Sequence, residues 1–117
     1  MTRQIGGGVL AGSSVRSTSI VGMWAVIQAG ETGKLHSSFN VASYTDNGAG
    51  DHTLTYNISF ASASDYVVVG SANTNVTGAY TADGSPPAAG SARIVTANTS
   101  AALVDSDPTT VIAVGRR

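Results

Sequence analysis

Residues 34–60 read KLHSSFNVASYTDNGAGDHTLTYNISF, and this stretch decides the fold. At its centre, in residues 45–51, an Asn-Gly pair and a second glycine can supply the positive φ angles of a tight reversal. Apolar residues alternate with polar ones on both sides of this turn. They are Leu35, Phe39 and Val41 before it, and Leu54, Tyr56, Ile58 and Phe60 after it. The sequence therefore predicts a β-hairpin over 34–60 whose strands each bury one face.

Short runs of β-branched and aromatic residues, separated by turn clusters, recur along the rest of the chain, and no segment has the length and apolar stripe of a stable helix. The run at 66–72 does not alternate, which predicts a more fully buried strand. The pattern predicts an all-β fold, a single antiparallel β-sandwich of jelly-roll-like or immunoglobulin-like type. The further strands are expected at 24–28, 66–72, 76–82, 92–96 and 109–114.

The chain of 117 residues is long enough for one domain with a modest core. Its first part, residues 1–22, is rich in Gly, Ser and Thr and cannot bury much apolar surface by itself. We expect residues 1–22 to form an extended N-terminal arm, either mobile or laid across another subunit. Residues 23–117 then form the sandwich.

Charged residues make up only 11% of the chain, against roughly 25% in an average globular protein. There is no cysteine, which excludes disulfides and cysteine-based zinc sites and permits assembly in a reducing cytosol. The longest apolar run, residues 20–27, is far shorter than the ~20 residues of a bilayer-spanning helix. We therefore expect no membrane insertion, no metal and no cofactor.

The few charges are distributed unevenly. Residues 1–22 carry two arginines and the C-terminal tail carries two more, while residues 23–115 carry seven acids against two basic residues, a net of −5. Basic ends on an acidic body suit docking to an acidic partner or to a neighbouring copy. No basic stripe interleaved with aromatics is present, so we expect no nucleic-acid partner. The predicted assembly contacts are Arg3, Arg16, Arg116 and Arg117.

Candidates for acid-base chemistry are few. His36 and His52 could lie near each other, with Asp51 close by, if the strands around the 45–51 turn pair. No nucleophile elbow accompanies them, and solvent-facing strand histidines are the favoured interpretation. The one glutamate, Glu31, stands in a glycine-flanked turn and has no partner for a glycosidase pair.

The 46–51 turn and the tyrosines each have two interpretations. Residues 46–51 offer oxygen ligands and glycines, but they lack the spacing and the distal Glu of an EF-hand, and a hairpin turn explains the same residues. Whether this turn binds a cation stays open. The tyrosines could anchor a recognition surface; the favoured alternative places Tyr56 and Tyr66 in the core and Tyr44 and Tyr80 at its rim.

At 38–43 (SFNVAS) and 45–54 (TDNGAGDHTL) the chain resembles a β-rich module of tailed-bacteriophage virion proteins, often labelled tail-fibre or tail proteins. The resemblance extends to 63–72 (ASDYVVVGSA) and 107–114 (DPTTVIAV), and so covers about residues 24–114. Such modules usually close a longer protein, with an aromatic-rich end, whereas here about 22 residues precede the module and Gly115-Arg116-Arg117 follows. This difference favours a decoration role over a fibre role.

The resemblance implies a non-enzymatic virion structural protein, made in the host bacterial cytoplasm and displayed on the particle surface as a capsid decoration or cement protein. Its expected partners are other copies of itself, by analogy in a trimer, and the major capsid protein or tail proteins. The alternative is a tail-fibre or spike tip that binds a host receptor through two exposed loops. A small glycan-active enzyme is disfavoured by the missing carboxylate pair. The loop residues are Asp46, Asn47, Gly48, Asp83, Gly84, Pro86 and Pro87.

Overall fold

The computed structural model describes residues 21–29, 34–73, 78–81 and 84–117. Within these ranges the chain forms strands and connecting loops and contains no helix. No helix of the described chain is therefore long and apolar enough to cross a membrane. The strands are β2 (Val21–Gln28), β3 (Lys34–Phe39), β4 (Val41–Gly48), β5 (Asp51–Tyr56), β6 (Tyr66–Ser71), β7 (Gly78–Thr81), β8 (Ser91–Ala97) and β9 (Thr109–Gly115).

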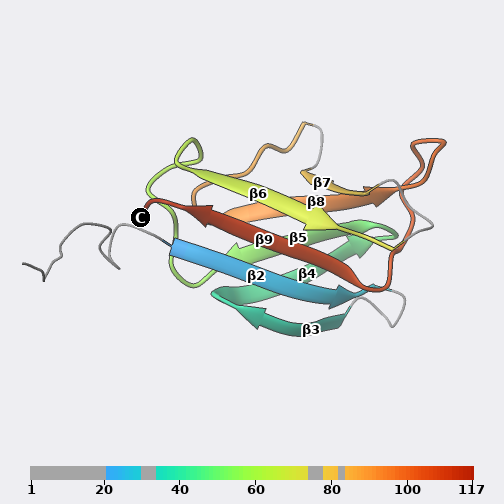
Figure 1. Ribbon diagram of the computed structural model, residues 1–117, viewed down its shortest axis with the longest axis horizontal. Coiled ribbons are helices and arrows are strands. Elements are labelled where there is room, and N and C mark those ends of the chain that lie inside the picture. The colour runs from blue at the N-terminus through green and yellow to red at the C-terminus, as the bar shows by residue number, and fades with distance from the viewer. Residues whose placement is uncertain (1–20, 30–33, 74–77, 82–83) are drawn as a thin grey trace, which may run out of the picture.

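The strands form two four-stranded antiparallel sheets that pack face to face. One sheet has the order β3-β2-β9-β6 and the other the order β4-β5-β8-β7. In Figure 1 the first sheet forms the front layer, with β6 at the top and β3 at the bottom, and the second lies behind it. The predicted β-sandwich is thus confirmed.

The core fills the space between the two layers with side chains from alternate strand positions. Strands β5, β8 and β9 alternate between buried and more exposed residues along most of their length, as expected for strands with one face against a partner sheet. The buried apolar residues are Met23, Ala25, Ile27, Ala29, Leu54, Tyr56, Phe60, Ala92, Ile94, Val111 and Ala113.

The first strand of the predicted 34–60 hairpin is broken at Asn40, which corrects the sequence-based hairpin. Asn40 has a φ of 61°, and the chain passes there from β3 in the first sheet to β4 in the second. Its side chain donates to the carbonyl oxygens of Gly22 and Ile58, both at 3.1 Å, and accepts from the Ile58 amide at 2.8 Å. The hairpin is therefore confirmed only for β4 and β5, and Asn40 fixes the corner between the sheets.

The turn of that hairpin lies where the sequence predicted it. Gly48 pairs with Asp51, and both Gly48 and Gly50 have positive φ angles, 132° and 64°. Gly50 is buried, and a Cβ atom built on it would lie 2.6 Å from the carbonyl oxygens of Thr96 and Val104. The second glycine thus serves two purposes, the turn itself and the close approach of two other segments.

Three expectations about burial were wrong. Phe39 was expected on a buried face, but its side chain is 56% exposed, because β3 presents that position to the outside of the first sheet. Strand β6 is not buried on both faces: Val67 and Val69 are exposed, whereas Tyr66 and Val68 turn towards the core. Ile58 lies beyond the end of β5 and is exposed as well.

The first described strand begins two residues before the expected start of the sandwich at residue 23. Strand β2 includes Val21 and Gly22, which the sequence assigned to the arm. Residues 1–20 lie outside the described residues, as do the ends of the strand expected at 76–82, of which 78–81 is described as β7.

Candidate functional site

The outer face of the first sheet carries a row of large apolar side chains that runs across all four strands. By register, Trp24 of β2 lies opposite Phe39 of β3 on one side and Ile112 of β9 on the other, and Ile112 lies opposite Val69 of β6. All four side chains are exposed, with 43% of Trp24 accessible to solvent. Successive side chains along a strand point to opposite faces of a sheet, so the residues that precede and follow Trp24 and Ile112 in the sequence point inward and belong to the core.

A second, shorter row lies beside the first. Gly22, Val114 and Val67 are register partners across β2, β9 and β6, and both valines are exposed. Of the eight large hydrophobic side chains exposed in the described chain, six therefore belong to these two rows. We call these six residues the outer face: Trp24, Phe39, Val67, Val69, Ile112 and Val114.

The outer face is not flat. Trp24 and Ile112 border two shallow hollows, one of about 380 Å³ that extends to Val69 and Ser71, and one of about 280 Å³ that extends to Phe39 and Val114. Gly22 lines the second hollow and contributes no side chain to fill it. Trp24 and Ile112 thus form a ridge between two depressions.

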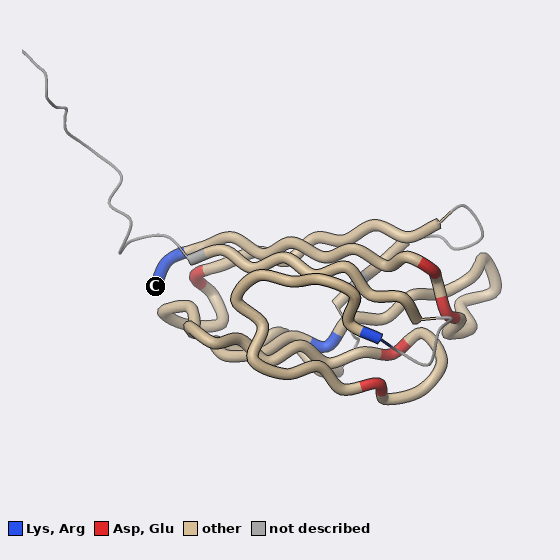
Figure 2. The backbone as a smooth tube through the Cα atoms, turned by 90° about the horizontal axis from the view of Figure 1, so that it is seen from below, with Lys and Arg blue, Asp and Glu red and all other residues tan. Residues whose placement is uncertain are grey.

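Charge is absent from most of this sheet. Strands β2, β6 and β9 contain no Asp, Glu, Lys or Arg, and β3 contains only Lys34 at its first position. Figure 2 shows the charged positions of this layer near the ends of its strands, with uncharged backbone between them. An apolar surface of this extent on one face of a small protein is typical of an interaction site.

The predicted 45–51 loop is held rigidly against the protein. The Gly48 amide donates to Oδ1 of Asp46 at 3.0 Å, and the Asn47 side chain donates to Oγ1 of Thr53 at 2.7 Å. The Gly50 amide donates to Oδ1 of Asp105 at 2.7 Å, which ties the turn to the loop before β9. One carboxylate oxygen of Asp46 and one of Asp105 thus accept backbone hydrogen bonds. In the described chain no group of three or more His, Cys, Asp or Glu residues could hold a metal ion.

Asp51 forms a bidentate ion pair at the end of the same turn. Its carboxylate accepts from Nε of Arg93 at 2.8 Å and from Nη2 at 2.5 Å. The hydrogen bonds from Arg93 hold the pKa of Asp51 below its usual value, against the opposing effect of burial. This pair links β5 to β8 on the outer side of the second sheet.

The two predicted receptor loops are linked through one side chain of β8. The loop 84–90, which contains Gly84, Pro86 and Pro87, leads into Ser91 at the start of β8, whereas the 48–51 turn lies beside Val95 near the other end of β8. Gly84 and Pro86 are exposed, and Pro87 is half-buried. Asp83 lies outside the described residues. Arg93 connects the two, because its Nε and Nη2 donate to Asp51 at the end of the turn and its Nη1 donates to Oγ of Ser85 in the loop at 3.4 Å.

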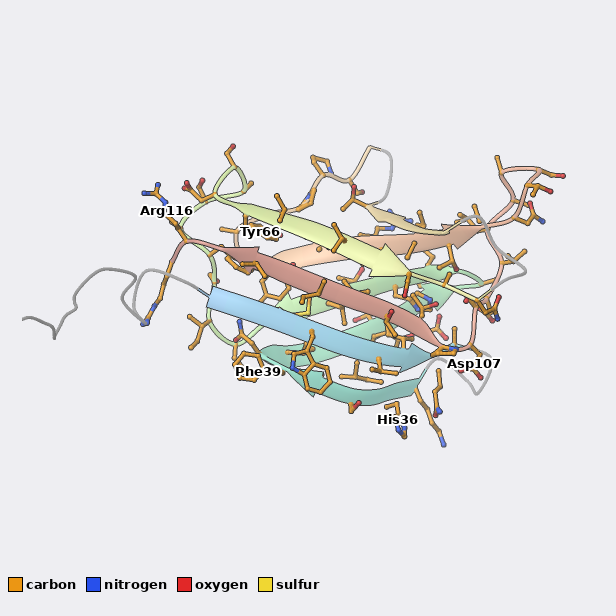
Figure 3. The ribbon with its side chains drawn as sticks, viewed as in Figure 1. His36, Phe39, Tyr66, Asp107 and Arg116 are labelled. Atoms are coloured by element: carbon orange, nitrogen blue, oxygen red, sulfur yellow. The ribbon has the colours of Figure 1, made fainter. Side chains whose placement is uncertain are left out.

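The histidines do not form a pair. His36 is exposed on β3 of the first sheet, as Figure 3 shows, whereas His52 is fully buried on β5 of the second sheet. The expectation of two solvent-facing histidines was therefore wrong for His52. Its Nδ1 lies 2.7 Å from the Tyr44 hydroxyl, and its Nε2 has no hydrogen-bond partner within the described part of the chain.

Burial dominates the electrostatics around His52. It lowers the pKa of His52, although the carboxylates of Asp46, Asp105 and Asp51 act in the opposite direction. Burial and the same Asp46 and Asp105 raise the pKa of Tyr44 to about 12. Both rings are therefore neutral at neutral pH, and they serve as a packed, hydrogen-bonded pair.

The tyrosines largely follow the favoured interpretation. Tyr56 is buried, and Tyr66 packs against the core with its ring stacked on Phe60 at a centroid distance of 4.0 Å. The Tyr66 hydroxyl donates to the Ala88 carbonyl oxygen at 2.7 Å and so holds the loop before β8. Tyr44 is half-buried at the edge of the core, and the side chain of Tyr80 is not described.

Of the predicted basic contacts, only the C-terminal pair lies in the described chain. Arg116 forms a salt bridge of 2.9 Å with Asp65 and remains largely exposed, and Arg117 is exposed. Figure 3 shows Arg116 beside the start of β6, at the opposite end of the molecule from Asp107. Arg3 and Arg16 lie outside the described residues.

The outer face is the feature that the sequence did not predict. Its signal was present: three valines in succession at 67–69 and the run 111–114 place apolar residues at both parities of a strand. A strand buried on both faces has the same pattern as a strand with one buried and one uncovered apolar face.

No protein-family model matches this chain, and no match to it was found among curated proteins or solved structures.

Proposed function

We propose that this protein is a non-enzymatic structural protein that works by binding to other protein surfaces, most specifically as a decoration or cement protein of a tailed-phage particle. The observation that carries the proposal is the outer face, whose six exposed apolar side chains lie on a sheet with a single charged residue, Lys34. The phage setting comes from the sequence resemblance over residues 24–114.

The mechanism is mass action. A protein that binds the assembled shell, and not its dissociated parts, stabilises the shell by its binding free energy. Many weakly bound copies then add up along a repetitive surface. The proposed contacts to the major capsid protein come from the arm, with Arg3 and Arg16, and the copies are held to one another through the sandwich.

The arm has a direct test that leaves the sandwich untouched. Because β2 begins at Val21, a deletion of residues 2–20 removes none of the described strands. We expect the shortened protein to keep its far-ultraviolet circular dichroism spectrum and to lose attachment to purified particles. Full occupancy of the particles by the shortened protein would contradict the role of the arm.

Copy number tests the location. Quantitative mass spectrometry of purified virions, with the major capsid protein as the internal reference, should find hundreds of copies per particle. A few to a few dozen copies would place the chain on the tail and favour the receptor-binding alternative. No copies would contradict the virion proposal.

A further inference from the structure

We propose that the outer face is covered by a second copy of this chain, so that the β3-β2-β9-β6 sheets of neighbouring copies pack against each other. This inference deepens the proposed function, because it assigns the surface through which the copies associate, and it can be tested on the purified chain without a particle.

The absence of charge favours a copy of the same chain over most other occupants. A nucleic acid, an anionic membrane or an acidic protein gains its affinity from basic groups, and β2, β6 and β9 carry none. A second copy presents the same uncharged face. The one charged residue of the sheet, Lys34, stands at the first position of β3, so away from that end two such faces can meet with no like-charge repulsion and with no buried unpaired charge.

The size of the face is sufficient for association. The whole sheet that carries the outer face has four strands about 4.8 Å apart and about seven residues long, and at ~3.3 Å per residue it spans roughly 400–450 Å² in projection. An interface buries one such surface on each copy, which doubles the area. Side chains that project from the sheet add further accessible area, so the total reaches about the 1,000 Å² that separates specific interfaces from incidental contacts. The largest apolar patch of a typical monomer covers about 300–600 Å² in total. We therefore expect a reversible association of moderate affinity.

The shape of the outer face, a ridge between two hollows, can fit against the same face of a second copy. The ridge of Trp24 and Ile112 lies between the two hollows. In a two-fold dimer, the ridge of each copy can therefore lie in a hollow of the other copy. Tryptophan in a pocket at the centre of an interface is the commonest energetic anchor of such contacts. Trp24 lies near the centre of the face, with Phe39 on one side and Ile112 on the other.

The chain offers a matched pair of variants for the test. Ile112, in the outer face, is 48% exposed, and Ile58, outside it, is 47% exposed. Sedimentation equilibrium of the full chain over a concentration series should show reversible association of the wild type. Ile112→Glu should raise the dissociation constant at least about tenfold, because it places like charges in the apolar contact, while Ile58→Glu leaves it unchanged.

A second variant keeps the test valid if Ile112→Glu does not fold. Val67→Thr with Val69→Thr preserves shape and strand preference at two exposed positions, and it should weaken association with an unchanged melting temperature. A particle of two chains that responds to these variants supports the inference, because a two-fold interface pairs the same face of both copies.

Three results would overturn the inference. The first is a wild-type chain that is monomeric at every concentration, and the second is an equal effect of Ile112→Glu and Ile58→Glu on the dissociation constant. The third is a monomeric chain whose Trp24 becomes accessible to quenchers when residues 2–20 are deleted. The last result would assign the face to the chain's own arm. A monomeric chain that is nevertheless found in virions would overturn this inference alone, whereas an associating chain that is absent from virions would overturn the proposed function alone.

Discussion

Two glycines of the hairpin turn differ in what surrounds them, and this difference predicts their sensitivity to substitution. Both have positive φ, but a Cβ on Gly48 would meet nothing within 4 Å, whereas a Cβ on Gly50 would collide with backbone atoms of Thr96 and Val104. Gly48→Ala should cost about 1–2 kcal/mol of unfolding free energy, from backbone strain. Gly50→Ala should cost about 3–5 kcal/mol, because two segments must also shift.

Urea unfolding of the two variants measures this difference, and each variant serves as the control of the other. Equal losses of stability would show that Thr96 and Val104 do not approach the turn as described. The sequence predicted that both glycines matter, because Asn-Gly followed by Gly indicates the turn. It could not predict the approach of residues about fifty positions away.

His52 predicts a dependence of stability on pH. Its pKa in the folded protein lies below the ordinary value of about 6.5, chiefly because burial disfavours the charged ring. The unfolded chain therefore binds more protons than the folded chain as the pH falls below about 6.5, and stability decreases by up to about 1.4 kcal/mol per pH unit. Above about pH 6.5 the ring of His52 is neutral in both the folded and the unfolded chain, so no stability is lost there.

The measurement is the urea midpoint between about pH 7.5 and about pH 5, above the range in which carboxylates titrate. His52→Gln should flatten the wild-type dependence of the midpoint on pH. A wild-type midpoint independent of pH over this range would contradict a neutral, buried His52.

Among the elements, the corner at Asn40 decides which sheet each half of the predicted strand joins. Asn40→Ala removes three hydrogen bonds and the side chain that supports a φ of 61°, and it should cost about 2–3 kcal/mol. Asn40→Gly retains the backbone freedom and loses only the hydrogen bonds, so it should cost less, about 1–2 kcal/mol. Thermal unfolding of both variants tests this order, and a Gly variant that is less stable than the Ala variant would contradict it.

The same corner shows how far the sequence could determine the elements. The alternation from Leu35 to Val41 is continuous through Asn40, so local pattern alone gives one long strand. The break depends on bonds from Asn40 to Gly22 and Ile58, each eighteen residues away. Strand positions and the turn follow from local chemistry, whereas the assignment of β3 and β4 to different sheets requires the tertiary contacts.

At the scale of the whole molecule, the sandwich could be predicted and its outer face could not. Turn spacing and β-branched runs indicate an all-β protein, and β2, β5, β8 and β9 lie where short apolar runs were recognised. Burial in β6 was overestimated, because Val67 and Val69 have the composition of a core strand. A core strand is covered on both faces, whereas in the described chain no second layer covers the outer side of β6. This uncovered apolar face is also the basis of the proposed function.

Trp24 allows the central claim, that copies of this chain cover the outer face, to be tested directly, since it is the one tryptophan of the chain and lies on that face. Its fluorescence should be blue-shifted and protected from acrylamide at high protein concentration, and it should shift to the red and become quenchable on dilution, in step with dissociation. Emission that is red-shifted and equally quenchable at every concentration would contradict the claim.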